Sequence, residues 1–191
     1  RATSDHGVVA DPNMAFRNRL QGLWIVAYVD PSTSGEPIDG AARAGDASVR
    51  RTGLAPGDRV AVENPGYHPP ARLFRTLGAQ LTGVPVDAEG LVVDSLPRNT
   101  RVVYVTPSHQ YPLGVTMSMR RRQALLEWAG RTNAAIIEDD YDSEFRFGGR
   151  PIEPLYTLDT TGRVVYIGSF SKTMLPTLRL GVIVTPPSLS A

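Results

Sequence analysis

From Pro56 onward, short and nearly continuous apolar segments alternate with segments whose apolar residues recur at helical spacing. The apolar segments are 60–62, 82–86, 101–105, 134–137, 164–167 and 180–184, and the helical ones are 67–77 and 119–132. Strands without polar alternation are buried on both faces, which is typical of a parallel sheet covered by helices on both sides. The pattern therefore predicts an α/β fold with a mostly parallel sheet.

The segment 119–132 shows the clearest helical pattern of the chain. Its apolar stripe is formed by Leu125, Leu126, Trp128 and Ala129. The charged residues of the segment are expected on the solvent side: Arg120, Arg121, Arg122, Glu127 and Arg131.

Residues 1–55 differ in character from the rest. The apolar patch 23–29 is compatible with a strand, but the remainder shows no sustained helical or alternating period. We therefore divide the chain into 1–55, which is poorly patterned and expected to be disordered or aberrant, and 56–191, a partial domain. Arg1 stands where a start methionine is expected, which indicates a fragment.

Composition narrows the class of protein. Apolar residues make up 41% and charged residues 20%, as in ordinary globular proteins, and a net charge of +1 favours neither nucleic acid nor membrane. There is no cysteine, and His6, His68 and His109 lie far apart in sequence, so we predict no metal site. No apolar run approaches the roughly 20 residues that span a bilayer. These features predict a cytoplasmic protein without a membrane partner.

Polar and ionisable residues follow several of the predicted strands, in the segments 106–112, 138–141 and 168–172. Ligands of open α/β sheets gather at the carboxyl ends of the strands, so these segments are expected to meet at one site. The last segment contains Lys172, the only lysine of the chain. Taken singly, Lys172 would be read as an exposed surface lysine and Asp139 as a helix or turn cap, so the interpretation depends on the segments together.

The segment GSFSK at 168–172, followed by Arg179, resembles the lysine loop of fold-type I pyridoxal-phosphate (PLP)-dependent aminotransferases of class I/II. The resemblance extends over about 56–187 and is closest to the aminotransferase-like domain of MocR-type regulators of the GntR superfamily. The strings TPSHQ at 106–110 and EDDYDSEFR at 138–146 are typical of that group. The resemblance implies a three-layer, PLP-transferase-like large domain, here incomplete.

The resemblance also implies roles in PLP binding. Lys172 would be the catalytic residue and hold the cofactor aldehyde as a Schiff base. Asp139 would keep the pyridine nitrogen protonated, and the Tyr141 hydroxyl would donate to the phenolate oxygen of the cofactor. Hydroxyl and cationic groups would bind the phosphate and an aromatic ring would stack on the pyridine face; the matching residues are Ser169, Ser171, Arg179 and Tyr67.

The chain departs from the family pattern in places that bear on function. No Ser-Gly-x-Gln phosphate turn is recognisable in 14–55, and no carboxyl-terminal substrate-binding domain follows the strand at 180–184. Tyr111 stands where true aminotransferases usually place asparagine, which agrees with MocR-type domains and counts against a standard transaminase.

The leading hypothesis is the effector-sensing, PLP-binding domain of a MocR-type transcriptional regulator. Chemistry at Lys172 would report PLP or a small amino compound. DNA binding would need a winged-helix domain that this chain lacks, and the family resemblance implies a homodimer. The alternatives are an aminotransferase acting on an amino acid and an inactive fragment.

Overall fold

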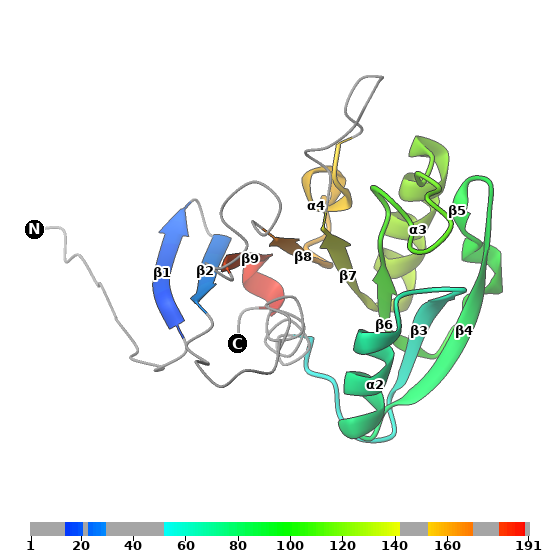
Figure 1. Cartoon of the computed structure of the whole chain (residues 1–191), viewed down its shortest axis with the longest axis horizontal. Coiled ribbons are helices and arrows are strands. Elements are labelled where there is room, and N and C mark those ends of the chain that lie inside the picture. The colour runs from blue at the N-terminus through cyan, green and yellow to red at the C-terminus, as the bar shows by residue number, and fades with distance from the viewer. Residues whose placement is uncertain (1–13, 21–22, 30–51, 142–152, 170–179, 190–191) are drawn as a thin grey trace, which may run out of the picture.

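The computed structural model describes residues 14–20, 23–29, 52–141, 153–169 and 180–189 (Figure 1). The strands are β1 (Met14–Leu20), β2 (Leu23–Val29), β3 (Arg59–Asn64), β4 (Gln80–Asp87), β5 (Gly90–Leu91), β6 (Thr100–Val105), β7 (Ala135–Asp140), β8 (Val164–Ser169) and β9 (Leu180–Thr185). The helices are α2 (His68–Thr76), α3 (Met119–Thr132) and α4 (Leu155–Leu158), with 3-10 turns η1 (Val93–Ser95) and η4 (Pro187–Leu189).

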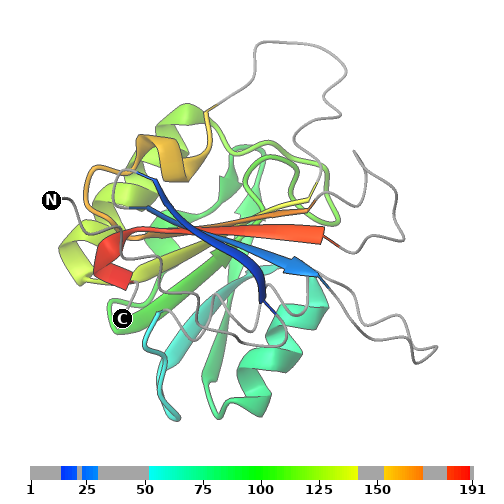
Figure 2. The same ribbon diagram turned by 90° about the vertical axis from the view of Figure 1, so that its left-hand side faces the viewer.

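The strands form one nine-stranded mixed sheet in the order β1-β2-β9-β8-β7-β6-β3-β4-β5. Within it, β8, β7, β6, β3 and β4 are neighbours that pair in parallel. Antiparallel pairing is found toward the edges, at β1, β2 and β9 on one side and β5 on the other. Figure 2 shows the strands crossing one another progressively, as the twist of a sheet requires. The predicted α/β fold with a mostly parallel sheet is confirmed.

Helices cover both faces of the parallel strands. One face packs against α3 and α4 through a core that includes Leu125, Trp128 and Leu155. The other face packs against α2, where Phe74 is fully buried against strand residues such as Val102. Because both faces are covered, the central strands are apolar along most of their length. No helix among the described residues is long and apolar enough to cross a membrane.

The predicted helix 119–132 is α3, and its bounds agree with the prediction. The Ser118 side chain caps its first turn by accepting from the Arg121 N–H at 3.2 Å, and Asn133 ends it in the left-handed conformation. The prediction that Arg122 faces solvent is wrong, because its side chain is fully buried. Arg122 precedes Leu125 and Ala129 at helical spacing, so it lies on the apolar stripe itself.

Other segment predictions hold with small shifts. The apolar patch 23–29 is β2 and pairs with β9, while β1, whose sequence has no clear period, pairs with β2. The predicted strand at 134–137 continues further, since β7 runs to Asp140. Glu138, Asp139 and Asp140 are therefore buried residues of the strand rather than residues that follow it.

Candidate functional site

The parallel strands β3, β6, β7 and β8 end at one edge of the sheet, and predicted site residues lie there. Asp139 is the penultimate residue of β7 and Tyr141 follows that strand. Tyr67 is the N-cap of α2, just beyond β3. The backbone turns sharply between Glu63 and Tyr67. A Cβ on Gly66 would lie 2.3 Å from the Glu63 carbonyl oxygen, so this turn requires glycine.

Asp139 is a buried carboxylate held by a tyrosine from the neighbouring strand. Its side chain is 7% exposed, and the Tyr104 hydroxyl of β6 donates to its Oδ2. Burial, followed by the Asp139 charge, raises the pKa of Tyr104 well above its usual value, so the hydroxyl stays a donor. A carboxylate that receives such a bond is stabilised in its ionised form, which suits the recognition of a protonated ring nitrogen.

Tyr141 and Tyr67 both contact the loop that follows β6. The Tyr141 hydroxyl donates to the His109 carbonyl at 2.8 Å, and the two rings are 6.0 Å apart between centroids. Tyr67 packs edge-to-face on Tyr111, with ring centroids 5.6 Å apart. The loop 106–111 thus joins the tyrosines predicted from two different strand ends.

The remaining predicted residues are only partly within the described structure. Ser169 is the last residue of β8 and pairs with Gly181 of β9, but its side chain is outside the described part. Ser171, Lys172 and Arg179 lie outside the described residues.

The structure adds a group that the sequence reasoning missed. Glu63 of β3 is 5% exposed, and its Oε2 accepts from the Thr106 hydroxyl at 2.7 Å and from Gln110 Nε2 at 3.3 Å. Burial raises the pKa of Glu63 to about 7, opposed by the bonds from Thr106 and Gln110. The sequence does contain a signal for Glu63: it follows the apolar segment 60–62, as the other polar segments follow their strands.

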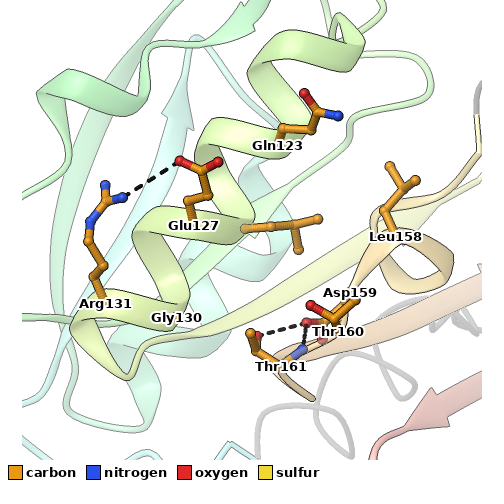
Figure 3. A pocket seen from close by; sticks show the side chains of 9 residues that line it. Gln123, Glu127, Gly130, Arg131, Leu158, Asp159, Thr160 and Thr161 are labelled. Atoms are coloured by element: carbon orange, nitrogen blue, oxygen red, sulfur yellow. Dashed lines mark hydrogen bonds and ion pairs between the residues drawn. The ribbon is translucent and has the colours of Figure 1, made fainter.

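A separate open groove of about 590 Å³ lies between α3 and the loop before β8 (Figure 3). Its charged groups are paired locally: Arg131 lies 3.7 Å from Glu127, and Asp159 accepts from the Thr161 N–H and hydroxyl at 2.8 Å. The groove is formed by the end of α3 that precedes β7 and the loop that precedes β8. It therefore lies toward the amino ends of these strands, away from Asp139, and is not the site described above.

Comparison with known proteins decides the family. The family model of aminotransferase class I and II matches residues 37–190, and its match begins upstream of Pro56. The chain belongs to this family. Its fold is that of a solved family member: Pyrococcus horikoshii kynurenine aminotransferase, crystallised with PMP, superposes with a TM-score of 0.77 at 34% identity, over 89% of this chain and 42% of that one.

Two curated relatives of this aminotransferase-family chain carry the names of regulators. The HTH-type transcriptional regulator YhdI of Bacillus subtilis is 50% identical over 137 residues, which is 71% of this chain and 29% of YhdI. MocR of Rhizobium meliloti, whose name assigns it to regulation of rhizopine catabolism, is 45% identical over 135 residues, 70% of this chain and 27% of MocR. The chain thus spans less than a third of the length of these relatives. The predicted resemblance to MocR-type, aminotransferase-like domains is confirmed.

Proposed function

We propose that this chain is a PLP-binding domain and senses an effector within a MocR-type transcriptional regulator. The observation that carries the proposal is the buried Asp139 carboxylate with its Tyr104 donor, at the strand edge that also bears Tyr67 and Tyr141. The family match and the regulator relatives support it.

The described residues fit a PLP ring. Asp139 is an ionisable acceptor removed from water, as a protonated pyridine nitrogen needs, and Tyr67 offers an aromatic face at the same edge. When bound, PLP supplies an electrophilic carbonyl for amines and a protonated ring that accepts electrons. Tyr67 and Asp139 would orient the ring. Ser169, Ser171 and Arg179 would hold the phosphate, and Lys172 would hold the carbonyl carbon.

The hydrogen bonding of Tyr141 refines its proposed role. Its hydroxyl proton is directed at the His109 carbonyl, so in this arrangement the phenol oxygen can accept a hydrogen bond from a ligand. To donate to a phenolate oxygen of the cofactor, the hydroxyl would have to rotate away from His109. Cofactor binding would therefore change the hydrogen bond between Tyr141 and His109 of the loop 106–111.

Borohydride reduction of the purified protein with PLP tests the proposal. We expect a pyridoxyl adduct that peptide mass spectrometry maps to Lys172, the only lysine of this chain. Lys172→Arg is the matched control, because it keeps the positive charge but has no amine that can form the reducible bond. Absence of the adduct, or its persistence elsewhere in Lys172→Arg, would contradict PLP binding through Lys172.

An aminotransferase acting on an amino acid is the second candidate, favoured by the likeness to the kynurenine aminotransferase. In that case Lys172 would also move the proton between substrate and cofactor. Conversion of the bound cofactor by an amino acid, with release of an oxo acid, separates this enzyme from a sensor. We also propose that the complete protein is a cytoplasmic homodimer that reaches DNA through a separate winged-helix domain. An inactive fragment would give neither adduct nor conversion.

A further inference from the structure

Glu63 is a buried carboxyl group whose two oxygens have different surroundings. Oε2 accepts from the Thr106 N–H at 3.3 Å, the Thr106 hydroxyl at 2.7 Å and Gln110 Nε2 at 3.3 Å. Oε1 is buried and has no hydrogen-bond partner within the described part of the chain. Buried polar atoms are rarely left unsatisfied, so this oxygen requires a physical account.

Thr106 and Gln110, which donate to Glu63, also hydrogen-bond to Tyr111 in the loop after β6. The two hydrogens of Gln110 Nε2 are shared among three acceptors, which are Glu63 Oε2, the Pro65 carbonyl at 2.9 Å and the Tyr111 carbonyl at 2.6 Å. The Tyr111 N–H donates to the Thr106 hydroxyl at 3.2 Å. Gln110 is 1% exposed, so these bonds are shielded from water. Through Thr106 and Gln110, Glu63 connects the end of β3, which leads to Tyr67, with the loop after β6.

Glu63 is also coupled by charge to the carboxylate of the site. The Asp139 charge adds to burial in raising the pKa of Glu63. Tyr104 of β6, which donates to Asp139, is a further ionisable group coupled to Glu63. Two neighbouring buried carboxyl groups cannot both ionise without a large cost. Asp139 has a phenolic donor that stabilises its charge, whereas Glu63 has an oxygen with no donor directed at it.

We propose that Glu63 is a positioning residue of the ring-binding site, acting on the cofactor through Asp139 and the loop 106–111. When Glu63 is neutral, its proton resides on Oε1, because Oε2 already accepts from Thr106 and Gln110. The pair then carries one negative charge, located on Asp139, which matches the single positive charge of a protonated pyridine ring. Ionisation of Glu63 would place a second negative charge beside it. This assignment rests on the proposed PLP binding.

The substitutions Glu63→Gln and Glu63→Leu separate the two parts of this role. Glutamine can place its oxygen at the Oε2 position and its amide nitrogen at the Oε1 position, so it reproduces the neutral carboxyl group. Leucine removes the acceptor of Thr106 and Gln110. Glu127→Gln, on the exposed side of α3, is the matched control, since its side chain is 71% exposed.

The dissociation constant of PLP, measured at equilibrium at pH 6, tests whether Glu63 positions the ring-binding site. We expect Glu63→Gln to bind within about twofold of the wild-type protein and Glu63→Leu to bind about tenfold more weakly, as the loss of a hydrogen bond to a buried carboxyl group implies. Circular dichroism confirms that each variant is folded. Wild-type affinity in Glu63→Leu would overturn the positioning role, and a loss in Glu63→Gln as large as in Glu63→Leu would overturn the neutral carboxyl.

A pH titration of the absorbance of bound PLP measures the charge coupling, which a merely structural residue would not affect. Above about pH 7 Glu63 loses its proton, and its negative charge then stabilises protonated forms of the bound cofactor. Glu63→Gln lacks this charge and should move the midpoint to lower pH by roughly half a unit or more. An unchanged midpoint would overturn the coupling while PLP binding stands. Failure of the wild-type protein to bind PLP would instead overturn the proposed function together with this assignment.

Discussion

Two buried glutamates, Glu63 on β3 and Glu138 on β7, are alike in burial but differ in surroundings. Burial raises the pKa of each to about 7. Both Glu138 oxygens accept backbone N–H groups at 2.9 Å, from Leu155 and Tyr156, and the Arg122 guanidinium lies 3.6 Å away. Among the described residues, Glu63 has no such cation, and its Oε1 has no partner.

The difference separates a carboxyl group that supports the fold from one that serves the site. Glu138 holds the start of α4, and its charge is compensated by Arg122 from α3, so the three elements are tied together. Glu63 lies beside a second carboxyl group, Asp139, and has donors only on one oxygen. Equal burial and a similar pKa therefore leave room for different roles, because the two carboxyl groups are held by different partners.

Removing Arg122 should have the largest effect on the folded protein. Its guanidinium donates to the carbonyls of Met117, Pro107 and Glu153 and compensates Glu138. Arg122→Met should lower the free energy of unfolding by about 3–5 kcal/mol, since it leaves a buried carboxylate without its counter-ion. Urea denaturation measures this.

The matched control for this change is Arg131→Met on the same helix. Arg131 is 68% exposed and, within the described part of the chain, pairs with exposed Glu127, so its loss should change stability by about 0.5 kcal/mol or less. Equal effects of the two substitutions would show that the Arg122–Glu138 pair does not support the fold.

Substitution of each glutamate by glutamine should distinguish the two residues. In the unfolded chain a glutamate loses its proton near pH 4.5, whereas folded Glu63 keeps it up to about 7. Its contribution to stability is therefore largest below pH 4.5 and falls as pH rises toward 7, by up to about 3 kcal/mol. Glu63→Gln should remove this part of the decline, as measured by thermal unfolding from pH 4.5 to 8.

Glu138→Gln, measured in the same way, gives the comparison that separates the two glutamates. It also removes a titrating carboxyl group, but it leaves buried Arg122 without a counter-ion, so it should destabilise the protein at pH 7.5, where Glu63→Gln should not. If both variants were equally stable at pH 7.5, the distinction between the two glutamates would fail.

Smaller effects are expected from the tyrosine donors to adjacent aspartates of β7. Tyr104 donates to Asp139, and Tyr166 donates to Asp140 at 2.8 Å. Tyr104→Phe and Tyr166→Phe should each cost about 1–2 kcal/mol of stability. Of these two variants, only Tyr104→Phe should weaken PLP binding, because it removes the hydrogen bond that stabilises the ionised Asp139 carboxylate. A similar loss of PLP affinity in both variants would contradict the assignment of Asp139 as the ring partner.

Much of this organisation could be predicted from local patterns. The bounds of α3 follow from its apolar stripe, and the central strands follow from apolar runs between turn residues. Asp139 and Tyr141 could be placed at the end of a strand from a motif typical of the family, and their roles in cofactor binding stay predictions. The roles of Lys172 and Arg179 stay predictions, since both lie outside the described residues.

What sequence reasoning missed depends on partners that are distant in the chain. Arg122 was predicted to face solvent from its charge, although its position in the helical period placed it on the apolar stripe. Its burial becomes tolerable only because Glu138 and backbone carbonyls surround it in the fold. Glu63 was overlooked because nothing near it in sequence shows that Thr106 and Gln110 donate to it.

Sequence patterns alone are sufficient to predict the α/β class, the order of strands and helices along the central part of the chain, and membership of the aminotransferase family. These properties follow from local periodicity and from motifs that keep their order. The packing of distant elements, in contrast, gives Glu138 a counter-ion and leaves Glu63 without one among the described residues. Charge states in a protein interior depend on burial and on groups that arrive from other strands and helices, and parallel strands bring together residues that are far apart along the chain.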